Sequence, residues 1–201
     1  MTIYVYHELQ DSHLCGQHCL NNLLQDNFFS AVHLGDIAQE LDEKERMIMG
    51  VVYAPSSNVD ESGNFSIQVL RLALQRYHNI DLVPWHFKSE GEDSDPLLQQ
   101  GFVVNRSEHW FAIRKVNDKW WNLNSTSERP ELVSPFYLSA LLHQLRQDGY
   151  SVFIAKGNLP TNTTGKSSHG VASGDNCNWY TESQLLSHSG GAINSAAAGT
   201  Q

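Results

Sequence analysis

The sequence predicts an α+β protein in which helices pack on a mostly antiparallel sheet. Apolar residues recur at helical spacing in three segments of the N-terminal half, which favours helices there. Strand-like runs separated by acidic or Gly/Pro-containing turns follow at 80–86, 101–105, 109–116 and 119–124, and a last one at 150–155. A chain of 201 residues, 40% of them hydrophobic, can bury one core of ordinary size.

The predicted helices begin at residues that commonly cap helix N-termini. Ser12 is expected to cap the first helix, which places Cys15 near the third helical position. Ser30 and Ser66 precede the second and third helical patterns. Ser134, followed by proline at the first helical position, starts a fourth helix before the last strand.

The composition divides the chain near Pro160. Residues 1–160 hold the predicted helices and strands and form the expected catalytic domain, whereas residues 161–201 are mostly Ser, Thr, Gly, Asn and Ala. Such a segment cannot offset its ordering entropy by burial, so residues 161–201 are expected to be a disordered tail. A short helix around 182–187 that meets a partner is the alternative.

Charge and cysteine content narrow the class of protein. With 13 basic and 22 acidic residues the net charge is −9, which argues against nucleic acid or an anionic membrane as the main partner. No run reaches the length of a transmembrane helix, and the N-terminus lacks the regions of a signal peptide. Three cysteines are too few for a secreted disulfide framework, so a reducing compartment, the nucleus and cytoplasm, is expected.

One cysteine lies where a thiol can become a nucleophile. Cys15 falls in the first turn of the first predicted helix, where the helix dipole and a neighbouring imidazolium would lower its pKa. Cys15 could instead be a buried structural thiol, or a metal ligand with Cys19, His13 and His18, although a second pair of ligands is missing. Cys19 continues the apolar face of the helix and is expected to be a small core residue.

A predicted hairpin in the second half brings a histidine and an asparagine together. Asn117-Asp118 between two strand-like runs indicates a two-residue turn, and that turn sets Val116 opposite Lys119. Because side chains alternate between faces, His109 and Asn124 then share one face as diagonal neighbours. Diagonal pairs lie within about 7–8 Å at the backbone, close enough for an amide to reach an imidazole. Alternatively, His109 is only a partly buried ring on a sheet, with no catalytic role.

A cysteine at a helix terminus and an asparagine-oriented histidine form the constellation of a papain-like cysteine hydrolase. His109 would take the proton of Cys15 and later return one to the leaving amine, while Asn124 holds the ring in the useful tautomer. Gln10, five residues before Cys15, could donate its amide N–H to the oxyanion, or it could be an ordinary loop amide.

Five segments in order along the chain carry a closer likeness. They are YHELQ at 6–10, LCGQHCLNNLLQ at 14–25, FSIQV at 65–69, EHWF at 108–111 and WNLNS at 121–125. Together they resemble the Josephin domain, a family of deubiquitinating cysteine proteases, over about residues 3–160. The resemblance implies a papain-like fold of the Josephin type, with Cys15, His109 and Asn124 at the triad positions and Gln10 at the oxyanion position. It also implies hydrolysis, through a thioester, of the bond after the C-terminal glycine of ubiquitin, with no cofactor and no metal.

The resemblance further implies partners and contact residues. Ubiquitin, polyubiquitin chains or ubiquitinated proteins would be the substrates of a monomeric chain that binds neither nucleic acid nor membrane. Exposed aromatic side chains would complement the apolar patch of ubiquitin. The positions implied for this contact are Phe28, Phe29, Ile67, Gln68, Tyr77 and Trp110. Phe28 and Phe29 could instead cap the core.

The sequence also shows two departures from the family and leaves three competing functions open. Residues 49–59 leave room for only a short version of the family's helical arm, and the tail shows no ubiquitin-interacting helix. One competitor is a ubiquitin-binding module with negligible turnover, against which the complete set of four catalytic positions argues. A second is a papain-like hydrolase or transferase acting on small amides, which would need a deep closed cleft. A third is a metal-binding structural protein.

Overall fold

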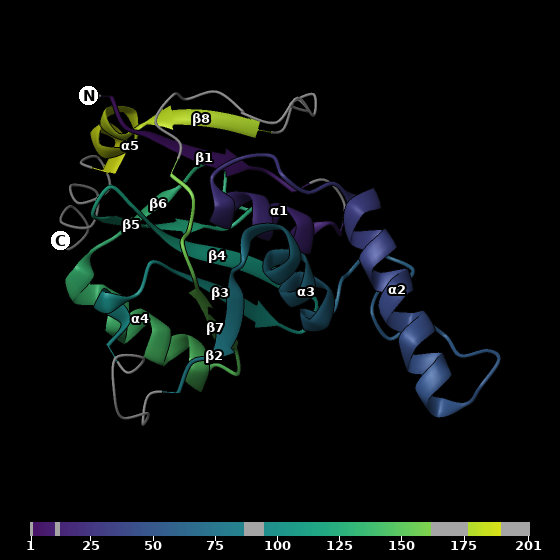
Figure 1. The fold of residues 1–201 in the computed structure, drawn as a ribbon. Helices are drawn as coiled ribbons and strands as arrows, with labels where there is room; N and C mark the ends of the chain where they lie inside the picture. Colours follow the sequence, from purple (N-terminus) through teal and green to yellow (C-terminus); the bar gives the residue numbers. More distant parts are fainter. Residues whose placement is uncertain (1, 11–12, 87–94, 162–176, 190–201) are drawn as a thin grey trace, which may run out of the picture.

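The computed structural model describes residues 2–10, 13–86, 95–161 and 177–189 and confirms the α+β architecture (Figure 1). The helices are α1 (Cys15–Leu24), α2 (Ala31–Met49), α3 (Ile67–His78), the short 3-10 helix η2 (Pro96–Leu98), α4 (Pro135–Gln147) and α5 (Glu182–Ser189). The strands are β1 (Tyr4–Glu8), β2 (Asp81–Pro84), β3 (Gly101–Arg106), β4 (His109–Val116), β5 (Lys119–Leu123), β6 (Glu131–Val133), β7 (Ser151–Lys156) and β8 (Cys177–Thr181).

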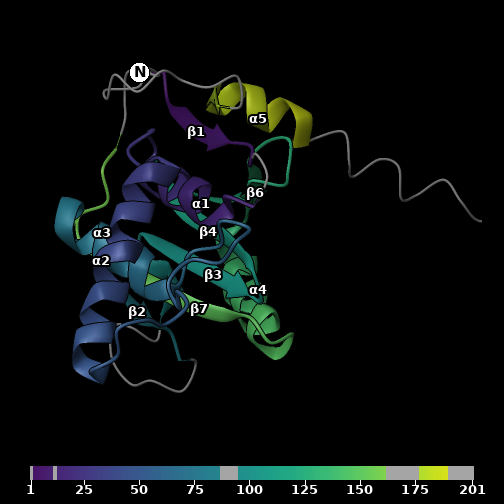
Figure 2. The ribbon, with the colours of Figure 1, turned by 90° about the vertical axis from the view of Figure 1, so that its right-hand side faces the viewer.

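Six strands form one antiparallel sheet in the order β2-β7-β3-β4-β5-β6, with helices on both faces. α1 and α3 cover one face and α4 covers the other (Figures 1 and 2). Trp121 packs with Leu20 and Leu70 in the core under α1 and α3, whereas Trp120 packs with Leu142 in the core under α4. The two tryptophans serve different cores because neighbouring strand residues face opposite sides of a sheet.

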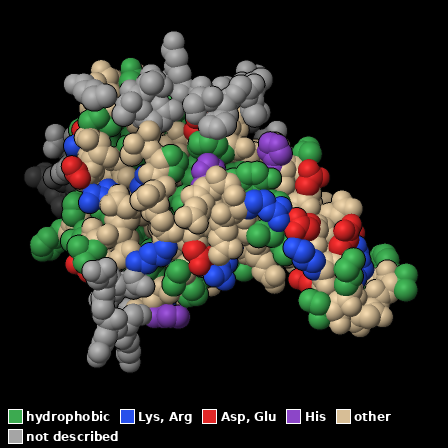
Figure 3. All heavy atoms as spheres, in the orientation of Figure 1, with side chains coloured by type: hydrophobic (Ala, Val, Ile, Leu, Met, Phe, Trp, Pro, Cys, Tyr) green, Lys and Arg blue, Asp and Glu red, His purple; other side chains and the backbone are tan. Residues whose placement is uncertain are grey.

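α2 projects from the body as an arm (Figures 1 and 3). Its start is fixed by the predicted cap, since the Ser30 hydroxyl accepts a hydrogen bond from the backbone N–H of His33. Around its far end the side chains of Met47, Ile48 and Tyr53 are exposed, and Figure 3 shows apolar atoms gathered at the tip. None of the described helices is both long and apolar enough to span a membrane.

The predicted hairpin between β4 and β5 is present. Asn117 and Asp118 form its turn with positive φ values of 47° and 62°, and Val116 pairs with Lys119. Asn tolerates this left-handed conformation better than most residues, and Asp shares that tolerance. The observed pairing is the register derived from residue spacing, so β5 ends where Asn124 can face the beginning of β4.

The expectation of a disordered tail does not hold for residues 177–189, which form β8 and α5, and a helix is present where the alternative placed one, around 182–187. β8 pairs with β1 in a separate antiparallel sheet of two strands, and the rings of Trp179 and Tyr6 lie 4.8 Å apart. Leu185 of α5 is 3% exposed and joins the core under α1. The few apolar anchors suffice because β1 supplies a backbone partner and the domain surface buries Leu185. Residues 162–176 and 190–201 lie outside the described residues.

Candidate active site

Cys15 is the first residue of α1. Its N-cap residue is Leu14, which makes no side-chain cap, and the expected cap Ser12 lies outside the described residues. The helix therefore begins later than predicted, and Cys15 takes the first helical position instead of the third. The backbone N–H groups of the first turn of a helix have no partner within the helix. Cys15 therefore still lies beside unpartnered backbone N–H groups, as the prediction of a nucleophile at this position requires.

The Cys15 thiol is nearly buried and contacts the backbone of β4. Its Sγ donates a hydrogen bond to the carbonyl oxygen of Glu108 at 3.1 Å, and the residue is 2% exposed. Burial raises the pKa of this thiol, while the backbone N–H groups of Trp110 and Gly16 act to lower it. The negative charge of Asp60 adds a smaller raising effect on the same pKa. In this state Cys15 is a neutral thiol, contrary to the expected lowering, because burial outweighs the helix terminus.

His109 and Asn124 meet as predicted. The ring Nε2 of His109 lies 2.8 Å from Oδ1 of Asn124. The same oxygen accepts hydrogen bonds from the backbone N–H and the hydroxyl of Thr126, at 3.2 and 3.0 Å. Because a backbone N–H can only donate, the atom that it meets is the amide oxygen, and His109 Nε2 must carry its own proton. This leaves Nδ1 of His109 as the ring nitrogen that can accept a proton.

The nucleophile and the base candidate lie at the same end of β4. Glu108 and Trp110, whose backbone groups contact the Cys15 thiol, are the two neighbours of His109 in the chain. Within the part of the chain that the structure describes, no hydrogen bond joins the thiol to the His109 ring. The thiol must therefore leave the Glu108 carbonyl before it can pass its proton to the imidazole.

Gln10 lies beside the asparagine of this constellation. It follows β1 by two residues, and its backbone N–H donates to the carbonyl oxygen of Ser125 at 2.9 Å. The Ser125 hydroxyl in turn donates to Oε1 of Gln10 at 3.0 Å. Since Ser125 directly follows Asn124, the predicted oxyanion donor is bonded to the short segment after β5 that contains the predicted triad asparagine.

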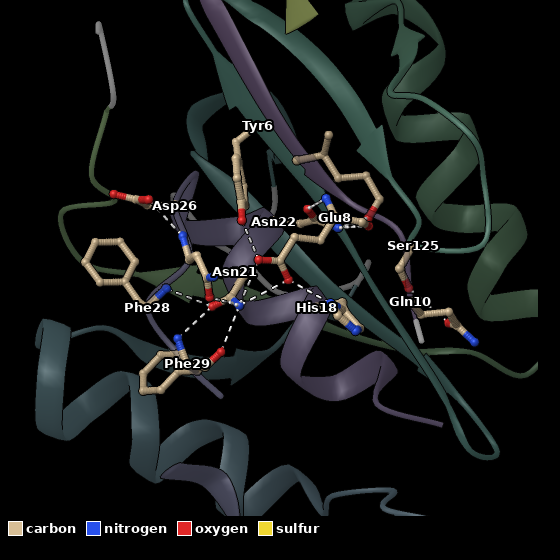
Figure 4. Close-up of polar contacts among 12 residues, drawn as sticks. Tyr6, Glu8, Gln10, His18, Asn21, Asn22, Asp26, Phe28, Phe29 and Ser125 are labelled. Atoms are coloured by element: carbon tan, nitrogen blue, oxygen red, sulfur yellow. Dashed lines mark hydrogen bonds and ion pairs between the residues drawn. The ribbon is translucent and has the colours of Figure 1, made fainter. Parts of the chain in front are cut away.

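Behind α1 lies a buried polar network that sequence reasoning missed (Figure 4). The Glu8 carboxylate lies 2.7 Å from Nδ1 of His18, accepts a hydrogen bond from the Tyr6 hydroxyl, and accepts from Asn21 Nδ2 at 3.1 Å to each oxygen. The side-chain oxygen of Asn22 accepts the backbone N–H of Glu8 at 2.6 Å. These bonds fix α1 against β1. The signal was present in the sequence, because His18, Asn21 and Asn22 recur at helical spacing on a helix that is otherwise apolar inward.

Three of the residues implied in ubiquitin contact gather around one cavity. Phe28, Phe29 and Tyr77 line a cavity of about 220 Å³ together with His33 and His78. The rings of Phe29 and Tyr77 lie 5.8 Å apart, and those of Phe28 and His78 lie 4.5 Å apart. Tyr77 is exposed and Phe28 half-buried, whereas Phe29 is buried. This aromatic cavity lies where the chain leaves α1, at the opposite end of the helix from Cys15.

The other implied contact residues lie near the Cys15 end of α1. Ile67 and Gln68 form the first turn of α3, half-buried and exposed respectively. Trp110 is only 5% exposed, and its indole N–H donates to the carbonyl oxygen of Phe65 at 3.1 Å. Trp110 therefore belongs to the core of this structure and does not present its ring to a partner.

The alternative roles weighed for the cysteines can be compared with the structure. Cys19 is fully buried in the core, and burial raises the pKa of its thiol well above the usual value. Across the described ranges no group of three or more His, Cys, Asp or Glu side chains could hold a metal ion. The side chain of Cys177 lies outside the described part of the chain.

Comparison with known proteins places the chain in a family. The family model described as Josephin matches residues 10–156. Ataxin-3 of Gallus gallus is 46% identical over 168 residues, and ataxin-3 of Homo sapiens is 45% identical over 168 residues. Each alignment covers 78% of this chain and 46% of the relative. The ataxin-3 homologue of Arabidopsis thaliana is 43% identical over 169 residues, covering 78% of this chain and 60% of the relative.

The chain thus spans about half the length of the two ataxin-3 relatives. The matched region contains the helix that begins at Cys15 and the hairpin that carries His109 and Asn124. The chain belongs to the Josephin family of ubiquitin-related cysteine proteases.

Proposed function

We propose that this chain is a cysteine-type deubiquitinase that hydrolyses the isopeptide or peptide bond after the C-terminal glycine of ubiquitin. The observation that carries the proposal is the bond between His109 Nε2 and Asn124 Oδ1, at the end of β4 that contacts the Cys15 thiol. This bond orients the imidazole so that Nδ1 is the proton acceptor, as general-base activation of a thiol requires. Membership of the Josephin family supplies the substrate class.

The reaction proceeds in two halves. The Cys15 thiol passes its proton to His109 Nδ1, and the sulfur attacks the carbonyl carbon of the ubiquitin glycine to give a tetrahedral oxyanion. The C–N bond then breaks, and the proton on His109 goes to the departing amine of the lysine or peptide. A thioester between Cys15 and ubiquitin remains. Water attacks it with His109 as base, which releases the ubiquitin carboxylate and restores the thiol.

The oxyanion needs donors that point at it while it forms. The amide N–H of Gln10 and the backbone N–H of Cys15 at the helix terminus are the donors in this proposal. Losing one donor of this kind typically lowers kcat by about 100- to 1000-fold. Gln10 is suited to the role because its backbone and its side-chain oxygen are both fixed to Ser125.

The aromatic cavity supports a protein substrate over a small amide. Phe28 and Tyr77 offer reachable aromatic surface on the domain, away from Cys15, which suits a broad apolar patch such as that of ubiquitin. A small amide would make no use of contacts at that distance from the thiol. Ile67 and Gln68, on the Cys15 side of the domain, complete the proposed contact.

One observation favours a second candidate, a ubiquitin-binding module with little turnover. The Cys15 thiol is buried, has a raised pKa and is bonded to the Glu108 carbonyl, so its resting state is not that of an activated thiolate. Under the principal proposal, substrate binding separates the thiol from Glu108 and brings it to His109. Under the second candidate that rearrangement does not occur.

Reaction with ubiquitin that carries a C-terminal electrophile separates the two. The chain is expected to form a covalent adduct at Cys15, which Cys15→Ala abolishes and Cys19→Ala retains. Noncovalent binding without an adduct would support the binding module instead. An adduct on Cys19 would overturn the assignment of the nucleophile.

A further inference from the structure

Ser125 is a buried serine that is bonded to Gln10. It is 2% exposed, and its hydroxyl donates to Oε1 of Gln10 while its carbonyl oxygen accepts the Gln10 backbone N–H. Ser125 and Gln10 are therefore bonded at two points, one on the backbone and one on the side chain, and Figure 4 shows their side chains next to each other. Nothing in the reaction described above requires the Ser125 hydroxyl to touch the substrate.

The side-chain bond holds the Gln10 amide in the orientation that the structure shows, with Oε1 toward the Ser125 hydroxyl. The oxygen and nitrogen of an amide lie on opposite sides of its carbon, so a donor fixed on Oε1 directs Nε2 away from itself. Without the hydroxyl the amide loses this attachment and can rotate, which lets it present its oxygen to a developing negative charge. An oxygen acceptor in that place would repel the oxyanion that an N–H donor stabilises.

The segment that holds Ser125 is itself anchored on both sides. Nδ2 of Asn22 on α1 donates to the carbonyl oxygen of Leu123 at 3.3 Å, and Nε2 of His7 on β1 lies 2.8 Å from the carbonyl oxygen of Ser127. Asn124, which orients His109, lies between these anchors and directly before Ser125. One anchored turn therefore fixes both the ring of the base and the amide of the oxyanion donor.

We propose that Ser125 is a positioning residue for the oxyanion hole, which holds the Gln10 amide with its N–H groups toward the reacting carbonyl. This proposal rests on the proposed function, since it assigns Ser125 a role in the same reaction. Its effect passes entirely through Gln10. Loss of the Ser125 hydroxyl should therefore destabilise the transition state for acylation. It should change neither the affinity for ubiquitin nor the reactivity of the free Cys15 thiol.

The test is a double-mutant cycle in steady-state hydrolysis of ubiquitin with a C-terminal fluorogenic amide. Ser125→Ala removes one hydrogen bond and is expected to lower kcat about tenfold with KM unchanged. Gln10→Ala is expected to lower kcat about 100- to 1000-fold. In the Gln10→Ala background, Ser125→Ala should cause no further loss, because the group it positions is already absent.

Two further measurements separate positioning from general damage. Alkylation of Cys15 by iodoacetamide forms no oxyanion, so its rate and pH profile should be the same for Ser125→Ala and the unmodified chain. Ser127→Ala is the matched control, since it shortens a serine in the same segment and keeps the backbone carbonyl that contacts His7. Ser125→Cys, which preserves the volume with a weaker donor, should lose less kcat than Ser125→Ala.

The possible outcomes are distinct. An equal loss from Ser125→Ala with and without Gln10, or no loss in either background, would overturn the positioning role while leaving the proposed function intact. A slowed alkylation in Ser125→Ala would show a general structural role and would also overturn it. If the unmodified chain neither hydrolyses the amide nor reacts with the ubiquitin electrophile, the proposed function fails, and this proposal fails with it.

Discussion

Replacing Asn21 should weaken the fold more than its polar character suggests. Asn21 is fully buried, and its Oδ1 accepts the backbone N–H groups of Phe28 and Phe29 at 3.1 and 2.8 Å. Its Nδ2 donates to the Phe29 carbonyl oxygen at 2.9 Å and to both oxygens of Glu8. Asn21→Ala leaves the buried Phe29 N–H without a partner and takes one donor from the buried Glu8 carboxylate, whereas the Phe28 N–H keeps its bond to the Asp26 carbonyl oxygen at 3.1 Å.

The expected loss follows from those two groups. Leaving the Phe29 N–H unsatisfied costs about 1–3 kcal/mol, and losing the hydrogen bond to the charged Glu8 carboxylate costs about 1.5–3 kcal/mol, so Asn21→Ala should lower the free energy of unfolding by about 2–6 kcal/mol. Against a total of about 5–15 kcal/mol, that is a large fraction of the stability of the domain. With a urea m-value of about 1–3 kcal/mol/M, the unfolding midpoint should fall by at least about 1 M.

The assay is urea unfolding followed by tryptophan fluorescence. Asn122→Ala is the matched control: its amide bonds Glu131 in an exposed pair at 3.1 Å, and the variant should change the unfolding free energy by less than about 1 kcal/mol. A change in Asn21→Ala as small as that of the control, at an unchanged m-value, would refute the claim that the buried network stabilises the turn.

Other expected outcomes concern the site, the pH dependence and the C-terminal helix. Asn124→Ala should lower kcat by about 10- to 100-fold, since the ring loses the bond that fixes its tautomer; ubiquitin affinity by calorimetry should not change. Iodoacetamide labelling of Cys15 in the free chain should still accelerate above pH 9, because burial raises the pKa of the thiol; a plateau near neutral pH would contradict this. Burial lowers the pKa of His7, so its stabilisation is complete above about pH 6.5 and is lost below it, as the unfolded chain takes up a proton that the folded chain does not. The unfolding free energy of His7→Gln should therefore fall less between pH 7.5 and 5.5 than that of the unmodified chain; equal slopes would argue against this titration. Leu185→Ala should cost about 2–5 kcal/mol in urea unfolding and Leu186→Ala much less, because Leu185 is buried and Leu186 is 36% exposed; equal effects would argue against the docking of α5.

The hairpin was predictable because its geometry depends on short-range rules. Asn117-Asp118 indicated a two-residue turn, which sets the register of the two strands. Because side chains alternate between the faces of a strand, residue spacing alone then placed His109 and Asn124 on the same face. The helix caps at Ser30 and Ser66 were predictable for the same reason, since a cap involves only residues within one turn.

Features that depend on contacts between distant parts of the chain were missed. β8 was not predicted, and a helix near α5 was predicted only as an alternative, because the backbone partner that orders these polar residues is β1, at the other end of the chain. The buried Glu8–His18 pair likewise joins β1 to α1, and the helical spacing of the polar residues on α1 does not reveal that a carboxylate of β1 faces them. The predicted lowering of the Cys15 pKa was wrong because the sequence shows the helix terminus but not the burial of the thiol against β4.

Our central proposal is that the Cys15 sulfur attacks and cleaves the amide bond at the C-terminus of ubiquitin. The imidazole of His109, which Asn124 orients, activates that sulfur. Acid-quenched single turnovers of a ubiquitin C-terminal amide, followed by intact-protein mass spectrometry, test it directly. The account predicts a transient ubiquitin thioester on Cys15 that hydroxylamine releases and that forms orders of magnitude more slowly in His109→Ala. Amide cleavage that proceeds unchanged in Cys15→Ala, or a thioester that forms at the same rate in His109→Ala, would contradict it.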